Sequence, residues 1–199
     1  MYSIGHSTHS WEKFSELLKA HNISAIADVR SSPYSRHFPH FSKSEIKSLL
    51  ASIGVSYVFL GKELGGRPEK PALFDGTVAD YEKMASEPAF QAGLHRLIGG
   101  AQKFRVAMMC AEHDPLDCHR CLMVSRSLRD REIETRHILQ TGNIATQTDI
   151  EEALLGMSGA QAGDLFMGRD EQLSLAYKQR AKRVAYSLDE NSQKLQEAS

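Results

Sequence analysis

One stretch of the chain, MMCAEHDPLDCHRCLMV (108–124), holds all three cysteines together with two histidines, three acids and an arginine. Thiolates are nucleophiles and metal ligands, imidazole and carboxylate groups carry protons, and guanidinium groups bind oxoanions. These residue types at this density predict either a thiol-based active site or a metal site.

The catalytic interpretation depends on a helix predicted over 117–128. If Asp117 caps this helix, the C-H-R triplet that follows occupies its first turn, where free N–H groups favour a thiolate. A cysteine of this stretch is then the nucleophile, and histidine or Glu112 carries the proton. The predicted catalytic residues are His6, Cys110, Glu112, Cys118 and His119.

The same cysteines allow a metal interpretation, because Cys118 and Cys121 form a C-x-x-C pair. Zinc and iron both accept thiolate and imidazole ligands. Structural zinc sites usually draw on two separated ligand pairs, and a second pair is missing here. The leading interpretation therefore requires no cofactor, and the alternative binds zinc or iron. The alternative ligand set is Cys110, Cys118, Cys121 and His119.

A second stretch, DVRSSPYSRHFPHF (28–41), supplies cations and hydroxyl groups, and LGGR adds Arg67. Convergent arginines beside a glycine-rich backbone suit a phosphate or carboxylate. The alternative is an internal ion pair between Asp28 and either Arg30 or Arg36. The predicted substrate-binding residues are Ser7, Asp28, Arg30, Ser31, Arg36, Arg67 and Arg120.

The pattern of apolar residues predicts the elements that position these side chains. Short apolar runs predict strands over 2–5, 24–29, 56–60, 104–110 and 135–139, and amphipathic stretches between them predict helices. This alternation indicates an α/β fold, with a mostly parallel sheet of about five strands in a Rossmann-like three-layer arrangement. The loops after the strands then share one edge, where ligands bind.

One helix has clear end signals. Ser42 and Glu45 have the spacing of a capping box, and Gly54 suits a left-handed C-cap. The first predicted helix likewise has Ser10 as its N-cap.

Four of these motifs together resemble a known family. IGHS, DVRSSPYSRHFPHF, LGGR and CAE followed by CHR are similar, in this order over roughly residues 2–139, to domain-of-unknown-function family 488. The resemblance implies a compact α/β domain whose paired cysteine segments mark a site, without a settled reaction. The position of Cys121 is commonly not cysteine in this pattern, so Cys121 is incidental to it.

Composition limits the function classes. The chain has 199 residues, of which 41% are hydrophobic, and a formal charge of −1, which excludes generic electrostatic binding to nucleic acid. The sequence contains neither an 18-residue apolar run nor a secretory signal pattern, and its odd cysteine count is a poor disulfide framework. We expect a cytoplasmic protein without membrane association.

The sequence after the last predicted strand has a different pattern, with a stretch of small residues followed by a charged, helix-favouring segment. This change predicts an α/β domain over 1–140 and a helical extension over 141–199. The apolar stripe of the extension either docks on the domain or pairs with a second copy as a homodimer. Its members are Leu173, Tyr177, Arg180, Val184, Leu188 and Leu195. The basic run KQRAKR (178–183) most simply forms a solvated face, with nucleic-acid phosphates as the alternative.

The sequence thus predicts a cysteine-dependent hydrolase or transferase that acts on a small anionic or phosphorylated substrate, with a nucleotide or base derivative as one such compound. The alternative is a protein without catalysis: a zinc or iron module, or a nucleic-acid-associated adaptor.

Overall fold

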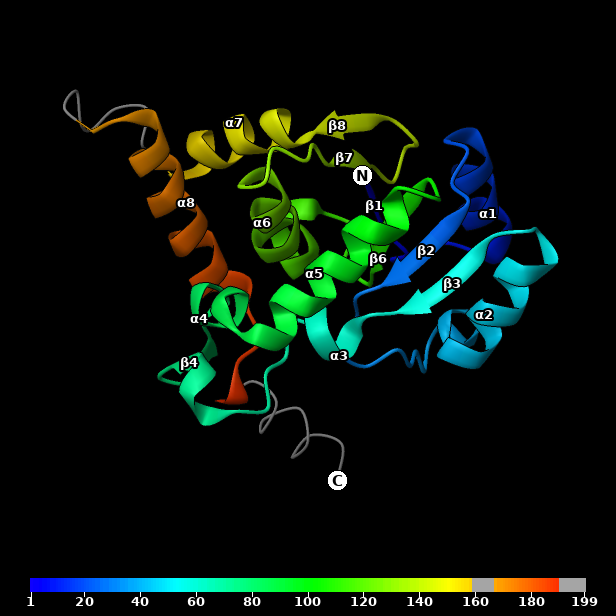
Figure 1. Ribbon diagram of the computed structural model, residues 1–199, viewed down its shortest axis with the longest axis horizontal. Helices are drawn as coiled ribbons and strands as arrows, with labels where there is room; N and C mark the ends of the chain where they lie inside the picture. Colours follow the sequence, from blue (N-terminus) through cyan, green and yellow to red (C-terminus); the bar gives the residue numbers. More distant parts are fainter. Residues whose placement is uncertain (159–166, 190–199) are drawn as a thin grey trace.

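The computed structural model describes residues 1–158 and 167–189, and it contains a six-stranded sheet in the order β3-β2-β6-β1-β7-β8 (Figure 1). The first five strands of this order run parallel, and β8 is antiparallel to β7. The strands are β1 (Tyr2–Gly5), β2 (Ala25–Asp28), β3 (Ser56–Phe59), β6 (Val106–Cys110), β7 (Arg136–Ile138) and β8 (Ile144–Thr146). A small hairpin, β4 (Phe74–Asp75) with β5 (Val78–Ala79), lies outside the sheet. The predicted mostly parallel α/β fold is confirmed.

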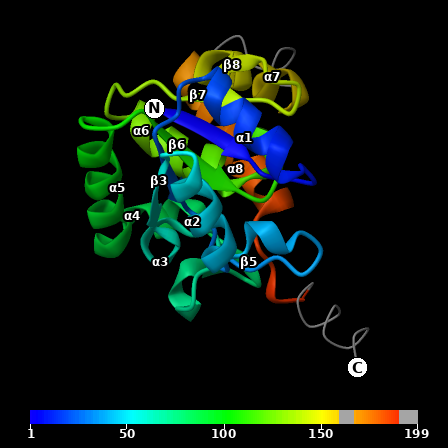
Figure 2. The same ribbon diagram turned by 90° about the vertical axis from the view of Figure 1, so that its right-hand side faces the viewer.

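Helices cover both faces of the sheet, so the fold has three layers. In Figure 2, α5 lies on one side of β3 and α1 and α2 on the other. The α-helices are α1 (Trp11–Ala20), α2 (Lys43–Ser52), α3 (Gly61–Leu64), α4 (Tyr81–Ser86), α5 (Pro88–Ala101), α6 (Arg126–Arg129), α7 (Gln147–Ser158) and α8 (Arg169–Val184). Short 3-10 turns are η1 (Pro39–Phe41), η2 (Pro71–Leu73) and η3 (Pro115–Asp117), and η4 (Arg120–Ser125) is a π-helix.

The alternation of side chains along β6 decides which layer receives the cysteine at its end. Ala107 and Met109 belong to the core beneath α1 and α2, whereas Val106, Met108 and Cys110 belong to the core beneath α5 and α8. Because successive side chains of a strand point to opposite faces, Cys110 points into the second layer.

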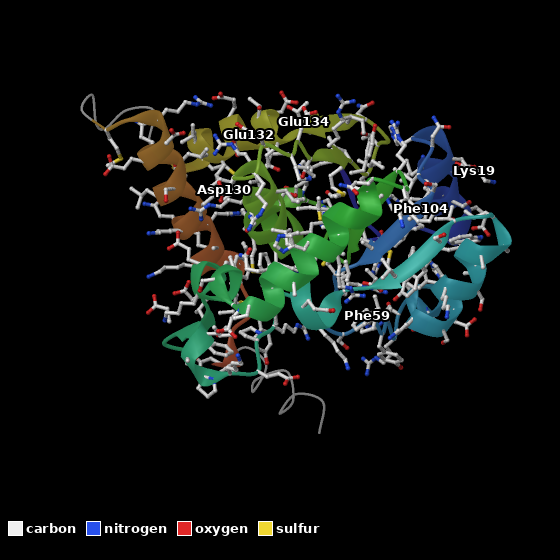
Figure 3. The ribbon with its side chains drawn as sticks, viewed as in Figure 1. Lys19, Phe59, Phe104, Asp130, Glu132 and Glu134 are labelled. Carbon is white, nitrogen blue, oxygen red and sulfur yellow. The ribbon has the colours of Figure 1, made fainter. Side chains whose placement is uncertain are left out.

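The carboxyl ends of the parallel strands gather on one side of the molecule. Phe59 ends β3 on this side, whereas Lys19 and Phe104, which precede β2 and β6, lie on the opposite side (Figure 3). The loops that follow β1, β2, β3 and β6 therefore share the Phe59 side, as expected for ligand-binding loops of an open α/β sheet.

Helix ends follow the sequence signals in part. Ser10 accepts a hydrogen bond from the N–H of Lys13 at 3.3 Å, and Gly54 has a φ of 74° as the left-handed cap of α2. The prediction of a capping box for α2 was wrong, because the Ser42 hydroxyl makes no cap hydrogen bond. It accepts one from the N–H of Ser35 at 3.2 Å and so ties the preceding loop instead.

The helix predicted over 117–128 was also wrong in its first part. Asp117 ends the η3 turn, and Cys118 is extended, with φ −135° and ψ 137°. The Cys118 carbonyl accepts hydrogen bonds from the N–H groups of Cys121 and Leu122, both at 3.0 Å, so helical structure begins after Cys118. Pro115 favours the extra turn, because it suits the first position of a new helical segment.

The C-terminal part packs against the rest of the chain. Its strand β8 pairs with β7, and Leu173, Ala176 and Tyr177 of α8 are buried in the α5-side core. Sheet and core therefore continue across the predicted boundary at residue 140. Leu195 lies outside the described residues, and homodimerisation stays a prediction.

Three residues of KQRAKR form ion pairs within the chain: Lys178 with Glu82, Arg180 with Asp117 and Lys182 with Asp75. Over 1–158 and 167–189, none of the helices has both the length and the apolar character that a membrane span needs.

Candidate active site

A cavity of about 390 Å³ opens at the carboxyl ends of the strands. The loops after β1, β2, β3 and β6 all contribute to its wall, together with α4 and the segment after α8. Its lining includes His6, Arg30, Ser31, Ser32, Tyr34, Ser35, Gly66, Arg67, Tyr81, Cys110, Glu112, Asp117, His119 and Tyr186. Loops that are far apart in the sequence therefore meet at one site, as the topology predicted.

Two sulfurs and one carboxylate cluster at the floor of the cavity, where Cys110 and Glu112 are part of the lining. The Sγ atoms of Cys110 and Cys118 each lie 3.0 Å from the same oxygen, Oε2 of Glu112. Glu112 is at an exposed position of the loop after β6, but its carboxylate is turned inward to the thiols. One carboxylate thus contacts both cysteines.

His119 completes this cluster. Its Nε2 lies 2.9 Å from the carbonyl oxygen of Val29, which accepts a hydrogen bond and so requires a proton on Nε2. Its Nδ1 lies 3.7 Å from Sγ of Cys110 and 3.9 Å from Sγ of Cys118. A Cβ on Gly66 would lie 2.7 Å from the ring, so this glycine allows the backbone to cover the imidazole.

The fully buried Arg120 supports the cluster from behind. Its Nη1 and Nη2 donate to the carbonyls of Glu112 and His113 at 2.6 and 2.9 Å, which fixes the loop after β6. Its backbone N–H donates to Sγ of Cys118 at 3.4 Å. The Cys118 sulfur therefore takes the capping position that the sequence predicted for Asp117.

The two thiols differ in acidity. Burial raises the pKa of Cys118, but the hydrogen bond from Cys110 and the charges of Arg120 and His119 outweigh it, so this pKa lies well below its ordinary value. Burial and the neighbouring Cys118 raise the pKa of Cys110. The pair therefore favours one thiolate, at Cys118, and one thiol, at Cys110, which faces the cavity.

Arg30 is held in a fixed orientation at the cavity wall. Its Nε and Nη2 donate to the two oxygens of buried Asp28 at 2.9 and 2.7 Å, and Tyr57 donates to Asp28 at 2.8 Å. Its Nη1 is 3.1 Å from Nε2 of His6. Three of the five N–H groups of the guanidinium are engaged in these bonds, which leaves two for a ligand. The predicted Asp28–Arg30 ion pair is present.

His6 orients this arginine. Its Nδ1 lies 3.1 Å from the carbonyl of Ser7, which fixes a proton there and leaves Nε2 to accept from Arg30. Burial and the charge of Arg30 lower the pKa of His6 to about 4, and the ring stacks on Phe41 with a centroid distance of 4.2 Å. In this arrangement the Nε2 lone pair of His6 accepts from Arg30, so His6 orients the guanidinium, and its predicted catalytic role stays a prediction.

The LGGR loop brings a second cation to the cavity. The N–H of Arg67 donates to Oγ of Ser31 at 2.9 Å, which joins the loops after β2 and β3. The Arg67 side chain is exposed and stacks over the ring of Tyr186 at 5.3 Å. Arg30 and Arg67 thus line the same cavity, Arg30 buried in a hydrogen-bonded network and Arg67 exposed to solvent.

Three predicted site residues contribute no side chain to the cavity lining or to the hydrogen bonds that hold it. Cys121 is buried in the core, 4.0 Å from Nε2 of Gln147. Arg36 is exposed on the loop after β2 and lies outside the cavity lining. Ser7 contributes its backbone, with a φ of 44° and an N–H that donates to the carbonyl of Ala111.

Comparison with known families gives one match. The family described as Domain of unknown function DUF488 matches residues 10–126, more than half of the chain. The chain belongs to this family. No curated protein and no solved structure matches it significantly.

Part of the cavity wall lies outside the DUF488 match. The segment after α8 pairs with the hairpin, where the N–H of Ala79 donates to the carbonyl of Tyr186 at 2.9 Å and Val78 bridges Ser187. In Figure 1 the end of α8 lies beside α4 and β4. Tyr186 was not among the predicted residues, because no local motif links a C-terminal residue to the cysteine loops.

Tyr81 at the start of α4 was also missed. It is buried, it lines the cavity, and burial together with the charges of Cys118 and Cys110 raises its pKa. Its only sequence signal is its place after Asp80, which caps α4 through the N–H groups of Glu82 and Lys83. A protonated hydroxyl therefore faces the thiol cluster.

The cluster also has the composition of a metal site. One donor atom from each of Cys110, Glu112, Cys118 and His119 lies within 4.8 Å of all the others. This set differs from the sequence alternative, because Glu112 takes the place of Cys121. Thiolate, imidazole and carboxylate are all ligands of zinc.

Proposed function

We propose that the protein is a cysteine-dependent hydrolase or transferase that acts on a small substrate with a phosphate or carboxylate group. In this proposal Arg30 and Arg67 bind the anionic group, Cys110 is the nucleophile, and Glu112 carries its proton. The observation that supports it most directly is that a preoriented arginine and a carboxylate-bound thiol line the same cavity.

Arg30 is suited to bind the anion because its orientation is set before the substrate arrives. Asp28 and His6 hold the guanidinium, so little side-chain entropy is lost when a ligand binds to its remaining N–H groups. Asp28 and Tyr57 stand behind Arg30 and do not contact the substrate. In this proposal the exposed Arg67 contacts the anionic group from the loop after β3.

Cys110 is the thiol that a substrate in the cavity reaches, since Cys118 is buried behind it. Its proton passes to Oε2 of Glu112, 3.0 Å away, and burial and the charge of Cys118 raise the pKa of Glu112, which strengthens it as a base. The charges of His119 and Arg120 offset the negative charge that the two sulfurs share.

The proposed reaction uses the groups at these positions. The Cys110 sulfur forms a bond to the electrophilic carbon or phosphorus, and the bond to the leaving group breaks with its electron pair. Glu112 returns the proton to the leaving group, with Tyr81 as a second hydrogen-bond donor. Water or an acceptor then breaks the bond to sulfur, and the thiol is restored.

Alkylation tests the thiol. In reduced, chelator-treated protein at neutral pH, iodoacetamide should alkylate Cys110 at least about tenfold faster than Cys121, as measured by peptide mass spectrometry. Cys121 is fully buried outside the cavity lining, so it serves as an internal reference. If iodoacetamide labels these two cysteines equally and slowly, Cys110 is not the nucleophile.

Protection tests the anion site. Pyrophosphate and adenosine monophosphate serve as probes, and binding of either should slow the labelling of Cys110. Arg67→Met should weaken this protection about tenfold, whereas Arg36→Met, an exposed arginine outside the cavity, should leave it unchanged. If both variants weaken protection equally, the effect is one of general charge and the anion site is rejected.

A further inference from the structure

The donor atoms at the cavity floor have a geometry that thiol catalysis alone does not require. A tetrahedral zinc ion with sulfur, nitrogen and oxygen ligands places neighbouring donors about 3.5 to 3.8 Å apart. Nδ1 of His119 lies 3.7 and 3.9 Å from the two sulfurs. Oε2 of Glu112 is 3.0 Å from each sulfur, so it needs to retreat by roughly half an ångström.

The imidazole is already oriented as a metal ligand needs. The carbonyl of Val29 accepts from Nε2 of His119, so Nδ1 points to the sulfurs and is the nitrogen that binds a metal once it gives up its proton. Metal-bound histidines usually donate their other N–H to a carbonyl or carboxylate in this way. Gly66 packs on the ring and prevents it from turning.

Charge balance gives a third, independent argument. Arg120 is fully buried, it forms no ion pair with a carboxylate in the described residues, and its Nε has no hydrogen-bond partner there. Two thiolates and one carboxylate exceed the charge of a divalent ion by one, and Arg120 supplies the matching positive charge. A buried cation needs such compensation.

We propose that Cys110, Glu112, Cys118 and His119 bind one zinc ion, and that the ion blocks the cavity thiol. Bound zinc holds both sulfurs as thiolates, and the proton of Cys110 is released to solvent. The metal site does not depend on the proposed reaction, but its role as an inhibitor rests on it. Zinc-bound and thiol-reactive proteins are then two alternative states of one cluster.

Metal titration tests the site directly. Reduced, metal-free protein should bind one zinc ion per chain in competition with a chromophoric chelator. Cobalt(II) should give the visible absorption of a tetrahedral site and the charge-transfer band of thiolate ligands. Cys118→Ala should weaken zinc binding at least about 100-fold and remove the charge-transfer band in large part. Cys121→Ala, a matched change three residues away, should leave both unchanged.

Several results would overturn the metal site: wild-type protein that binds zinc no more tightly than Cys118→Ala, equal losses in the two alanine variants, or cobalt absorption without thiolate bands. If Cys118→Ala does not fold, as judged by circular dichroism, Glu112→Ala at its exposed loop position takes its place. It should weaken zinc binding at least about tenfold and keep the charge-transfer band, because both sulfurs remain.

Labelling separates this inference from the proposed function. Zinc should slow the iodoacetamide labelling of Cys110 at least about tenfold and leave Cys121 unaffected. Zinc binding without fast labelling of the metal-free protein supports the metal site and overturns the proposed reaction. Fast labelling that zinc does not change overturns the metal site and leaves the reaction standing.

Discussion

Two buried histidines, His119 and His137, have opposite hydrogen-bond environments. Nδ1 of His137 lies 2.7 Å from Oγ of Ser3, and its Nε2 lies 2.8 Å from Oε1 of Gln147, so both ring nitrogens have a strong partner. Only Nε2 of His119 has an oxygen partner, and its Nδ1 faces two sulfurs beyond 3.5 Å.

The surroundings of His137 form a continuous buried chain of hydrogen bonds. Gln147 donates to the hydroxyl of Tyr177 at 2.6 Å, Tyr177 donates to Glu151 at 2.9 Å, and Arg129 pairs with the same carboxylate. Each group along this chain has a donor or acceptor that matches it. The chain joins β1, β7, α7 and α8, so its role is to hold the C-terminal helices on the sheet.

The difference between the two regions distinguishes a scaffold from a site. Buried polar groups normally satisfy one another, as they do around His137. The cluster around His119 instead keeps donor atoms within 4.8 Å of one another beside a cavity, and its cation Arg120 has no carboxylate partner among residues 1–158 and 167–189. These groups contact one another, and convergent titratable groups beside a cavity support our proposal that a ligand binds there.

The largest effect on stability is expected from Arg120→Met. This change removes the cation that offsets the sulfurs and frees the carbonyls of Glu112 and His113. We expect a loss of about 3–5 kcal/mol in the free energy of unfolding, measured by urea denaturation. Arg36→Met is the exposed control. A loss below about 1 kcal/mol for Arg120→Met would mean that the cluster carries no charge for Arg120 to balance.

Acid should lower the free energy of unfolding through protonation of His137. Burial lowers the pKa of His137 to about 4, whereas an unfolded histidine titrates near 6.5. Between these values the unfolded chain binds a proton that the folded chain does not, so stability falls as the pH decreases from about 6.5 to about 4, by up to about 3 kcal/mol.

The variant His137→Asn should flatten this pH dependence, whatever its constant loss of stability at neutral pH. Urea denaturation at several pH values measures the slope. The buried His6, whose pKa is also lowered to about 4, leaves a residual slope of the same sign. If the variant and the wild type have the same slope between pH 6.5 and 4, His137 is not the group that titrates.

Gln147→Leu separates scaffold from site. It leaves Nε2 of His137 without an acceptor and the Tyr177 hydroxyl without a donor, at a cost of about 1–3 kcal/mol in unfolding free energy. Zinc affinity and the labelling rate of Cys110 should stay as in the wild type, since neither the His137 ring nor the Tyr177 hydroxyl lines the cavity. A parallel loss of zinc binding would show that the two regions are coupled.

The site could be predicted where local sequence and sheet topology act together. Cys110 ends an apolar strand, and Arg30 follows another, so parallel pairing alone brings both to one edge. His119 and Glu112 flank the cysteines within the same loop. The fold class could be predicted for the same reason, because the alternation of apolar runs and amphipathic stretches is a local property.

Other features depend on packing that no local pattern contains. Cys121 has the spacing of a ligand, but the π-helix after Cys118 directs it into the core. Asp117 has the residue type of a helix cap, yet the turn from Pro115 ends at it, and Arg180 of α8 pairs with its carboxylate. Tyr186 reaches the cavity through pairing with a hairpin that the sequence did not indicate.

The smallest effect on stability, with the largest on the site, is expected from Glu112→Gln. Its carboxylate contacts the two sulfurs but holds no element in place, so the free energy of unfolding should change by less than about 1 kcal/mol. Labelling of Cys110 should slow at least about tenfold, because an amide does not accept the thiol proton. Urea denaturation and alkylation rates, measured on the same samples, should therefore show nearly unchanged stability with slow labelling. Gln147→Leu should show the reverse, reduced stability with normal labelling. A variant that loses stability but still alkylates normally would make Glu112 part of the scaffold, and the two buried regions would no longer differ in kind.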